Sequence, residues 1–327
     1  MKIAYFSITK QGKQLAERLN EQLPGTLFGK EDLKENLKKA FSEYDGLVCI
    51  MAAGIVVRIL APLFVHKQKD PAVVIMDSRG EYAVSLLSGH LGGGNELARR
   101  AAEISGGQAV ITTATDVEGT FAFDLFAKKN KLKIENIDQL KYISMALLES
   151  NSVQLLDTCR NFEIPEGRVH AYEETCPDPV VVIGDRLIRL SQKHCLYLRP
   201  RSLWIGIGCK EGVPGEKIVS AVENTLRKYE LSELSICGIS TIPKKKSEPG
   251  IIETALHFDV ELRAISTERI NQLDFEQLKI KQSSFVEHTV GSPSVSTASA
   301  YLASGCGEIL VDKEIFSGIT VSVVRKK

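Results

Sequence analysis

The sequence predicts a multi-domain α/β protein in which two α/β domains with mixed sheets are joined by a smaller middle α/β domain. Its 327 residues exceed the length of one typical domain. Apolar runs alternate with helically spaced apolar residues up to residue 125, and this alternation resumes at Leu203. The stretch between them has clustered lysines and short strand-like pieces. We therefore expect domains at residues 1–125, 126–201 and 202–327.

The first domain is expected to hold a largely parallel sheet with some antiparallel pairing. Apolar runs predict strands at residues 2–8, 47–52, 73–76, 82–87 and 109–112. Helical spacing predicts helices around residues 15–19, at 31–41 and from Asn95 to 106, with Asn95 as a good N-cap residue. The turn Ser78-Arg79-Gly80 predicts a hairpin, which is the source of the antiparallel pairing.

The apolar pattern of the middle domain is weak, whereas that of the last domain is strong. For the middle domain we expect a helix at 138–148 and strands at 153–156, 180–183 and 195–198, with no cluster of chemically active residues. In the last domain, apolar runs predict strands at 203–207, 235–240, 261–265, 309–311 and 319–324. Its helices are expected at 214–229, 250–258 and 293–303, and Pro214 suits the first turn of a helix.

Composition excludes several classes of protein. Lys+Arg and Asp+Glu both number 41, and this zero net charge argues against a protein that binds nucleic acid or anionic membranes generally. The seven cysteines form no C-x-x-C pair, and no signal peptide precedes the first strand. A reducing, cytoplasmic setting with free thiols is therefore expected. The apolar run from Gly46 to Val65 is long enough to cross a bilayer, but Arg58 and Pro62 interrupt it, so we interpret it as a buried strand followed by a helix.

A glycine-rich turn between Ser88 and Asn95 precedes the helix expected from Asn95. Free backbone N–H groups and the positive end of the helix dipole favour an anion there. The spacing G-H-L-G-G-G matches neither the dinucleotide fingerprint nor the P-loop, so a nucleotide-binding enzyme is disfavoured. A ligand rich in carboxylates would satisfy the same preference for an anion. The residues that we expect to bind substrate here are Ser88, Gly89, Gly92, Gly93, Gly94 and Asn95.

His90 lies inside this turn and is the candidate for proton transfer, because imidazole titrates near neutral pH. Asp116 follows the strand at 109–112 and is expected to orient His90 or to activate water; a turn or helix-cap role is the alternative. His90 could instead only pack the loop. Ser88 could be a nucleophile, but its adjacency to His90 does not by itself aim the hydroxyl at the imidazole.

Further binding residues are expected at strand ends. Thr112, Thr113 and Thr115 should face the same crevice as the glycine-rich turn. Arg58 needs a partner in its apolar run, either a substrate carboxylate or Asp77 in a structural salt bridge.

The last domain offers weaker candidates. Gly208 and Ser292 lie in turns that could hold a polar group of the substrate, whereas Cys209 is interpreted as a buried thiol. We expect no metal site in the protein, because the six histidines are scattered along the sequence.

Several motifs along the chain can be compared with known families. They are Gly54 to Leu63, Asp70-Pro71-Ala72-Val73-Val74, Leu86 to Asn95, Ile111 to Asp116, Gly206 to Cys209, Glu248-Pro249-Gly250 and the V-G-S-P from Val290. In these motifs the chain resembles the cobalt-precorrin-5A hydrolase family of anaerobic cobalamin biosynthesis. The final portion also resembles a small stand-alone protein of the aerobic pathway.

The resemblance implies a hydrolase that opens the δ-lactone of ring A in a cobalt tetrapyrrole. The methylated meso carbon leaves as acetaldehyde, and cobalt-precorrin-5B remains. It implies that cobalt arrives with the substrate, that no further cofactor is needed, and that the product can be handed to other enzymes of the pathway, with no nucleic acid or membrane as partner. The alternative is a non-catalytic carrier that delivers a corrinoid intermediate to a precorrin methyltransferase.

Overall fold

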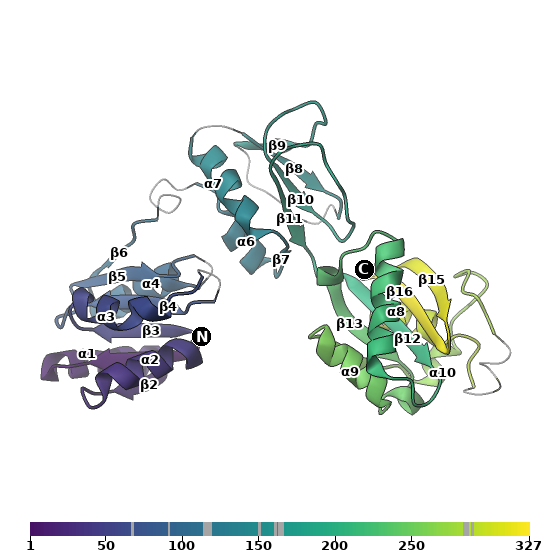
Figure 1. The fold of residues 1–327 in the computed structure, drawn as a ribbon, viewed down its shortest axis with the longest axis horizontal. Helices are drawn as coiled ribbons and strands as arrows, with labels where there is room; N and C mark the ends of the chain where they lie inside the picture. The colour runs from purple at the N-terminus through teal and green to yellow at the C-terminus, as the bar shows by residue number, and fades with distance from the viewer. Residues whose placement is uncertain are drawn as a thin grey trace. The chain divides into compact units, whose positions relative to one another are not determined.

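The computed structural model describes residues 1–66, 69–90, 92–113, 120–149, 152–159, 162, 167–283, 288 and 291–327. The chain forms two compact units. The first comprises residues 1–128 and 144–151, and the second comprises residues 129–143 and 152–327. Over the described residues there are three sheets, one in the first unit and two in the second (Figure 1).

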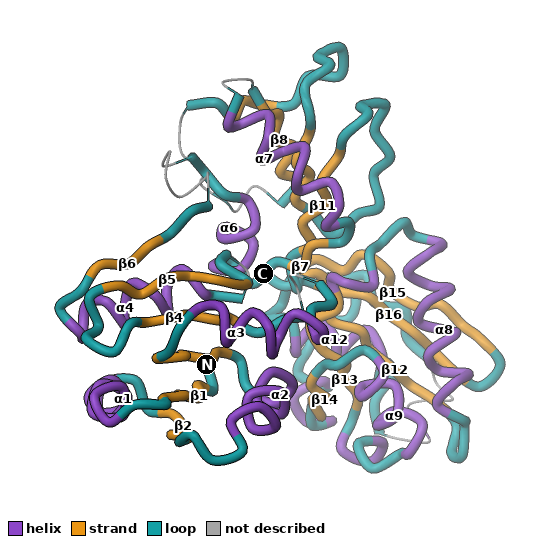
Figure 2. The backbone as a smooth tube through the Cα atoms, turned by 60° about the vertical axis from the view of Figure 1, so that its left-hand side comes forward, coloured by secondary structure: helices purple, strands orange, loops and turns teal. Residues whose placement is uncertain are grey.

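The sheet of the first unit has the order β2-β1-β3-β4-β5-β6, which Figure 2 shows as a stack of orange strands. Its strands are β1 (Ile3–Ser7), β2 (Gly25–Phe28), β3 (Gly46–Ile50), β4 (Ala72–Met76), β5 (Tyr82–Leu87) and β6 (Gln108–Val110). The first four strands are parallel, β5 is antiparallel to β4, and β6 is parallel to β5. The carboxyl ends of β5 and β6 therefore lie at the edge of the sheet where β1, β3 and β4 begin.

Helices cover both faces of this sheet. Apolar side chains of α1 (Lys10–Gln22) and α4 (Gly94–Ser105) form the core on one face. Those of α2 (Leu33–Glu43) and α3 (Ala53–Leu60) form the core on the other face. The hydroxyl of Thr9 caps α1 by accepting the N–H of Gly12, 3.0 Å away. The short turn η1 (Ala61–Leu63) follows α3, and α6 (Phe123–Lys129) follows the sheet.

The middle sheet, in the second unit, has the order β7-β11-β10-β8-β9. Its strands are β7 (Lys133–Ile134), β8 (Val153–Asp157), β9 (Val169–Ala171), β10 (Val180–Ile183) and β11 (Cys195–Arg199). Only the pairing of β7 with β11 is antiparallel among the pairings described in this sheet. The helical segments η2 (Ile137–Gln139) and α7 (Leu140–Leu148) lie between β7 and β8 in the sequence.

The last sheet has the order β14-β13-β12-β16-β15 and mixes parallel with antiparallel pairs. Its strands are β12 (Leu203–Cys209), β13 (Ile236–Thr241), β14 (Glu261–Ala264), β15 (Glu308–Phe316) and β16 (Ile319–Arg325). Helices α8 (Gly215–Lys228) and α9 (Pro249–His257) pack on one face, and α10 (Thr267–Ile270) and α12 (Ser296–Ala303) pack on the other. Two short 3₁₀ turns, η3 (Glu233–Ser235) and η4 (Pro243–Lys245), precede and follow β13.

An ion pair connects the middle and last parts of the second unit. Asp185, which is 1% exposed, accepts hydrogen bonds from Arg325 Nε at 2.7 Å and from Arg325 Nη2 at 2.8 Å. The Ser202 hydroxyl donates to the same carboxylate at 2.9 Å. Asp185 thus links Ser202, in the connection between β11 and β12, to Arg325 at the end of β16.

The predicted fold class is confirmed, and so are the expected strands of the first domain, to within about two residues at their ends. The elements β2, β7, β9, α6 and α10 were not predicted from the sequence, and the expected boundary between residues 125 and 126 falls inside α6. The run from Gly46 to Val65 forms β3, α3 and η1. Within the described residues, no helix has the length and apolar character needed to cross a membrane.

Candidate functional site

The glycine-rich loop connects β5 to α4 at the edge where β1, β3 and β4 begin. The N–H groups of Gly93, Gly94 and Asn95 donate to the carbonyls of His90, Ser88 and Gly89, at 3.0, 3.0 and 2.9 Å. The prediction that these three N–H groups are free for an anion is therefore wrong, because the loop uses them to close on itself. Asn95 is also not the N-cap: Gly93 caps α4 with a φ of 85°, and Asn95 is buried in the first turn.

Close packing explains why the loop is rich in glycine. A Cβ atom on Gly92 would lie 2.4 Å from the Cβ of Ser88, and one on Gly94 would lie 2.7 Å from the carbonyl oxygen of Leu87. A Cβ atom on Gly89 would lie 2.5 Å from Oδ1 of Asn95. Real side chains do not come so close, so these glycines are required by the shape of the turn. Their expected contact with substrate stays a prediction.

Ser88 anchors the start of the loop. It adopts a left-handed backbone conformation with φ of 54°, which is unusual for a residue other than glycine. Its hydroxyl donates to the carbonyl oxygen of Asp70 at 2.8 Å, and the carboxylate of Asp70 in turn accepts the N–H of Val65. Because the Ser88 hydroxyl is directed at Asp70, its geometry does not support the nucleophilic alternative.

His90 pairs with Asp124. The distance from Nδ1 to Asp124 Oδ2 is 3.1 Å, and the two side chains are 15% and 10% exposed. The second oxygen of Asp124 accepts the N–H of Leu125 at 3.0 Å, within the first turn of α6. Asp116, which was expected to orient His90, lies outside the described residues. Asp124 was not among the predicted site residues, although its place in the first turn of an apolar helix is a signal in the sequence.

The pair has a clear chemical capacity. An ionised Asp124 favours the tautomer of His90 in which Nδ1 carries the hydrogen, so Nε2 becomes the basic nitrogen. The same carboxylate stabilises the imidazolium ion that forms when Nε2 takes a proton. Burial strengthens this interaction, because the surrounding medium screens it less than water would.

A cavity of about 310 Å³ adjoins the loop at Gly93. Arg100 and Lys128 line it, together with one acidic residue, Glu96. A Cβ atom on Gly93 would lie 3.4 Å from Nζ of Lys128, which places this ammonium group against the loop. Arg100 and Lys128 thus supply positive side chains at this edge. The remaining lining residues are Met1, Ile3, Gln22, Leu23, Pro24 and Leu97.

The threonines after β6 are only partly described. Nδ2 of Asn95 donates to Oγ1 of Thr113 at 3.2 Å, so the end of β6 does lie beside α4 and the loop, as expected. Thr112 is exposed, and Thr115 lies outside the described residues.

Arg58 is exposed on α3 and makes no ion pair or hydrogen bond within the described part of the chain. Asp77 instead accepts the backbone N–H groups of Arg79 and Tyr82, each at 2.8 Å, so the expected salt bridge to Arg58 is absent from that part.

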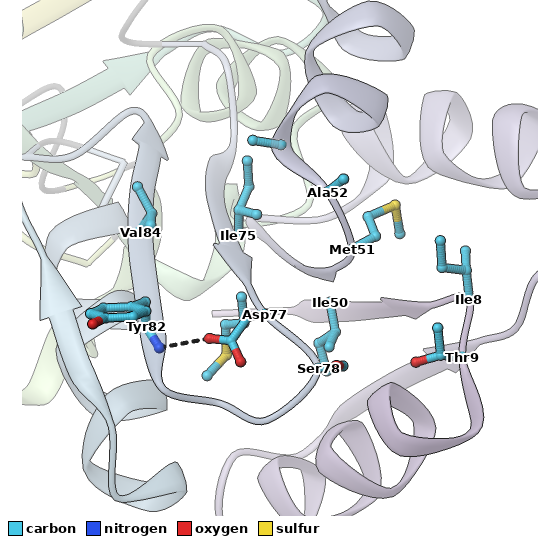
Figure 3. A pocket seen from close by; sticks show the side chains of 12 residues that line it. Ile8, Thr9, Ile50, Met51, Ala52, Ile75, Asp77, Ser78, Tyr82 and Val84 are labelled. Carbon is cyan, nitrogen blue, oxygen red and sulfur yellow. Dashed lines mark hydrogen bonds between the residues drawn. The ribbon is translucent and has the colours of Figure 1, made fainter.

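A second cavity, of about 400 Å³, lies at the opposite edge of the sheet, where β1, β3 and β4 end (Figure 3). Apolar side chains such as Ile8, Met51 and Val84 surround it. Desolvation tends to raise the pKa of Asp77 in its wall, but hydrogen bonds from backbone N–H groups outweigh this and hold that pKa below its usual value. This cavity can bind an apolar group, and among its lining residues there is no histidine to move a proton.

The candidates from the last domain have structural roles in the second unit. A Cβ atom on Gly208 would lie 2.6 Å from Oγ1 of Thr320, so glycine permits the close pairing of β12 with β16. Ser292 is fully buried, and its hydroxyl faces the carbonyl of Ser294 at 3.4 Å. Burial raises the pKa of Cys209, as expected for a thiol that is not a nucleophile. Binding of substrate by Gly208 and Ser292 stays a prediction.

Comparison with known proteins gives matches over nearly the whole chain. Residues 35–116 match the family "Cobalamin synthesis G N-terminal", 121–200 match "Cobalamin biosynthesis central region", and 203–324 match "Cobalamin synthesis G C-terminus". Cobalt-precorrin-5A hydrolase of Priestia megaterium is 30% identical, covering 98% of this chain and 94% of that protein. The protein of the same name from Salmonella typhimurium strain LT2 is 32% identical, covering 98% of this chain and 97% of that protein. The solved structure of CobE, a protein from the cobalamin (vitamin B12) biosynthetic pathway, is 23% identical over 38% of this chain and 92% of that one, with a TM-score of 0.36.

Proposed function

The chain belongs to the cobalamin synthesis G family, and from this premise we propose that it is a cobalt-precorrin-5A hydrolase. It opens the ring-A δ-lactone and releases the meso carbon as acetaldehyde, which gives cobalt-precorrin-5B in anaerobic cobalamin biosynthesis. The supporting observation is identity of 30% and 32% to two hydrolases across 98% of the chain. Both relatives are named as enzymes, so the carrier alternative is not favoured.

We assign the proton transfers to His90, oriented by Asp124. In lactone opening, water adds its OH to the carbonyl carbon, and the ring oxygen leaves with a proton as an alcohol. In carbon–carbon cleavage, that hydroxyl loses its proton, a C=O bond forms, and the bonding pair passes into the macrocycle. Nε2 of His90 is suited to take a proton in either step and to return it. The single observation behind this assignment is the 3.1 Å contact of Nδ1 with Asp124.

The substrate carries several acetate and propionate carboxylates. Arg100 and Lys128 are placed in the cavity beside Gly93 to bind one of them, and Arg58 and Thr112 remain candidates for others. Cobalt belongs to the substrate in this proposal, and no other cofactor takes part. The seven cysteines are all free thiols. A reducing compartment suits them, so we propose a cytoplasmic enzyme that can hand its product to the next enzyme of the pathway.

An anaerobic assay tests this function. Purified full-length protein is mixed with cobalt-precorrin-5A, acetaldehyde is trapped, and the macrocycle is followed by its absorption and mass. The expected result is one acetaldehyde released per macrocycle, with repeated turnover. Tight binding of the macrocycle without acetaldehyde would contradict the hydrolase and support the carrier. The His90→Ala variant should bind substrate but turn it over at least about tenfold more slowly.

A further inference from the structure

The second unit brings together three potential metal ligands that are not part of the site described above. His170 lies on β9, the edge strand of the middle sheet, and Cys176 and Asp178 lie on the loop that leads from β9 to β10. Nε2 of His170 is 3.8 Å from Sγ of Cys176 and 4.0 Å from Oδ2 of Asp178. The three ligand atoms all lie within 4.8 Å of one another.

The loop that carries Cys176 and Asp178 is held by a fully buried side chain. Nε2 of Gln154, on β8, donates to the carbonyl oxygens of Cys176 and Asp178 at 3.1 and 3.0 Å. Its Oε1 accepts the N–H of Glu173 at 2.8 Å. One amide group therefore fixes the backbone on both sides of the thiol. The hydroxyl of Ser152 donates to Oδ2 of Asp178 and orients its carboxylate.

We propose that His170, Cys176 and Asp178 form a binding site for a divalent transition-metal ion, and that this ion is Zn²⁺. A set of one imidazole, one thiolate and one carboxylate suits zinc and does not suit Mg²⁺ or Ca²⁺, which prefer oxygen ligands alone. Tetrahedral zinc with ordinary bond lengths places such ligand atoms about 3.3–3.6 Å apart. The separations of 3.8 and 4.0 Å, and the limit of 4.8 Å for all three atoms, require side-chain rotations that bring the ligands closer by up to about 1 Å.

Access and coordination number are consistent with this assignment. The side chains of His170 and Asp178 are 40% and 30% exposed, so an ion can enter from solvent. Three protein ligands leave the fourth tetrahedral position to water. The ion ties the loop to the edge strand β9 and covers part of that edge. The sequence did not indicate the site, because H-x₅-C-x-D matches no common zinc-binding spacing.

Metal binding can be measured on the full-length protein after treatment with a chelator and removal of that chelator. Co²⁺ serves as the spectroscopic probe, because a Co²⁺–thiolate bond gives a charge-transfer band in the near ultraviolet. The expected result is one Co²⁺ per chain with this band, and loss of the band when Zn²⁺ is added. Cys176→Ser should abolish the band, and His170→Gln should weaken Co²⁺ binding by at least about tenfold.

Two control variants remove an exposed cysteine and a histidine elsewhere. Cys306→Ser and His257→Ala should bind Co²⁺ as the unaltered protein does. Ser152→Ala keeps all three ligands and should weaken binding by about tenfold or less. Circular dichroism shows whether each variant is folded. Absence of the band in the unaltered, folded protein would overturn the proposal and leave a hydrogen-bonded cluster only. Persistence of the band in Cys176→Ser would overturn it as well.

Discussion

At the scale of single residues, the pairing of His90 with Asp124 is the feature with the most direct consequence for catalysis. An imidazole without a fixed partner can rotate and can carry its hydrogen on either nitrogen. The carboxylate of Asp124, 3.1 Å from Nδ1, removes both freedoms. In the proposed mechanism, Asp124 is therefore a positioning residue that acts through His90.

Replacing Asp124 by Asn should lower kcat by at least about tenfold and leave substrate affinity within about threefold, because the ring loses its orientation and the stabilisation of its cationic form. Acetaldehyde release and equilibrium binding of the macrocycle measure the two effects separately. Asp77→Asn is the matched control, since Asp77 lies in the other cavity and should leave kcat unchanged. A parallel loss of affinity and turnover in Asp124→Asn would mean that Asp124 only supports the fold.

Glu248 gives a prediction about pH and stability. Its carboxylate accepts the N–H of Gly212 at 2.6 Å and pairs with Lys245 at 3.1 Å. These two contacts lower the pKa of Glu248 from the usual value of 4.5. A carboxylate with a lowered pKa in the folded state stabilises that state above pH 4.5, and the contribution is lost as the pH falls through the folded-state pKa.

Glu248→Gln should therefore reduce the free energy of unfolding by about 1 kcal/mol near neutral pH, because a charge-assisted hydrogen bond becomes a neutral one. The difference from the unaltered protein should shrink as the pH is lowered below 4.5. Urea unfolding over a pH series measures this. Glu216→Gln, at an exposed position, serves as the control. A difference that is the same at every pH would contradict the prediction.

At the scale of elements, the glycine-rich loop and α3 offer a matched pair of glycine substitutions. In Gly92→Ala the new Cβ would lie 2.4 Å from the Cβ of Ser88, so the loop must open or shift. In Gly54→Ala no atom lies within 4 Å of the new Cβ. Gly54 is exposed within α3, where alanine is the better helix former.

Gly92→Ala should lower the thermal midpoint and reduce turnover, with a cost of about 1–3 kcal/mol from overpacking. Gly54→Ala should raise stability by about 0.5–1 kcal/mol and leave turnover unchanged. Calorimetry and the acetaldehyde assay measure the two properties. Equal effects of the two substitutions would show that the loop yields more easily than its packing indicates.

Most elements could be predicted from the sequence because their apolar periodicity is strong. The strand at Val180–Ile183 is a continuous apolar run with proline on one side and glycine on the other, and its predicted bounds are those observed. The strand β2, in contrast, is a short edge strand whose side chains are largely exposed, so no apolar pattern marks it. The N-cap of α4 was predicted wrongly because the adjacent glycines allow a left-handed residue, Gly93, to cap the helix two residues before the asparagine.

At the scale of the whole molecule, the contacts that define sites connect residues far apart in the sequence. Asp124 reaches His90 across 34 positions, and Arg325 reaches Asp185 across 140. Periodicity carries no information about such pairs, so the sequence could indicate His90 but not its partner. The cluster of His170, Cys176 and Asp178 spans only nine residues, and it was not predicted because its spacing matches no common zinc-binding pattern.

Removing one partner of the ion pair between Asp185 and Arg325 should strongly destabilise the second unit. The hydrogen bonds that Arg325 donates to Asp185 raise the pKa of Arg325 further above its already high value, so the arginine stays charged. Arg325→Ala should reduce the free energy of unfolding by about 3 kcal/mol, because it leaves a buried carboxylate without its cation. Urea unfolding measures this. The double variant with Asp185→Asn should recover part of the loss, and a double variant as unstable as the single one would contradict this explanation.

The self-bonded glycine-rich loop has a further consequence for recognition. Its three internal hydrogen bonds form part of the fold, so much of the entropic cost of ordering this segment is met during folding. A macrocycle that reaches this edge of the sheet meets a preorganised wall. We therefore expect selection at this edge to act through shape, because close-packed backbone excludes peripheral groups that do not fit it.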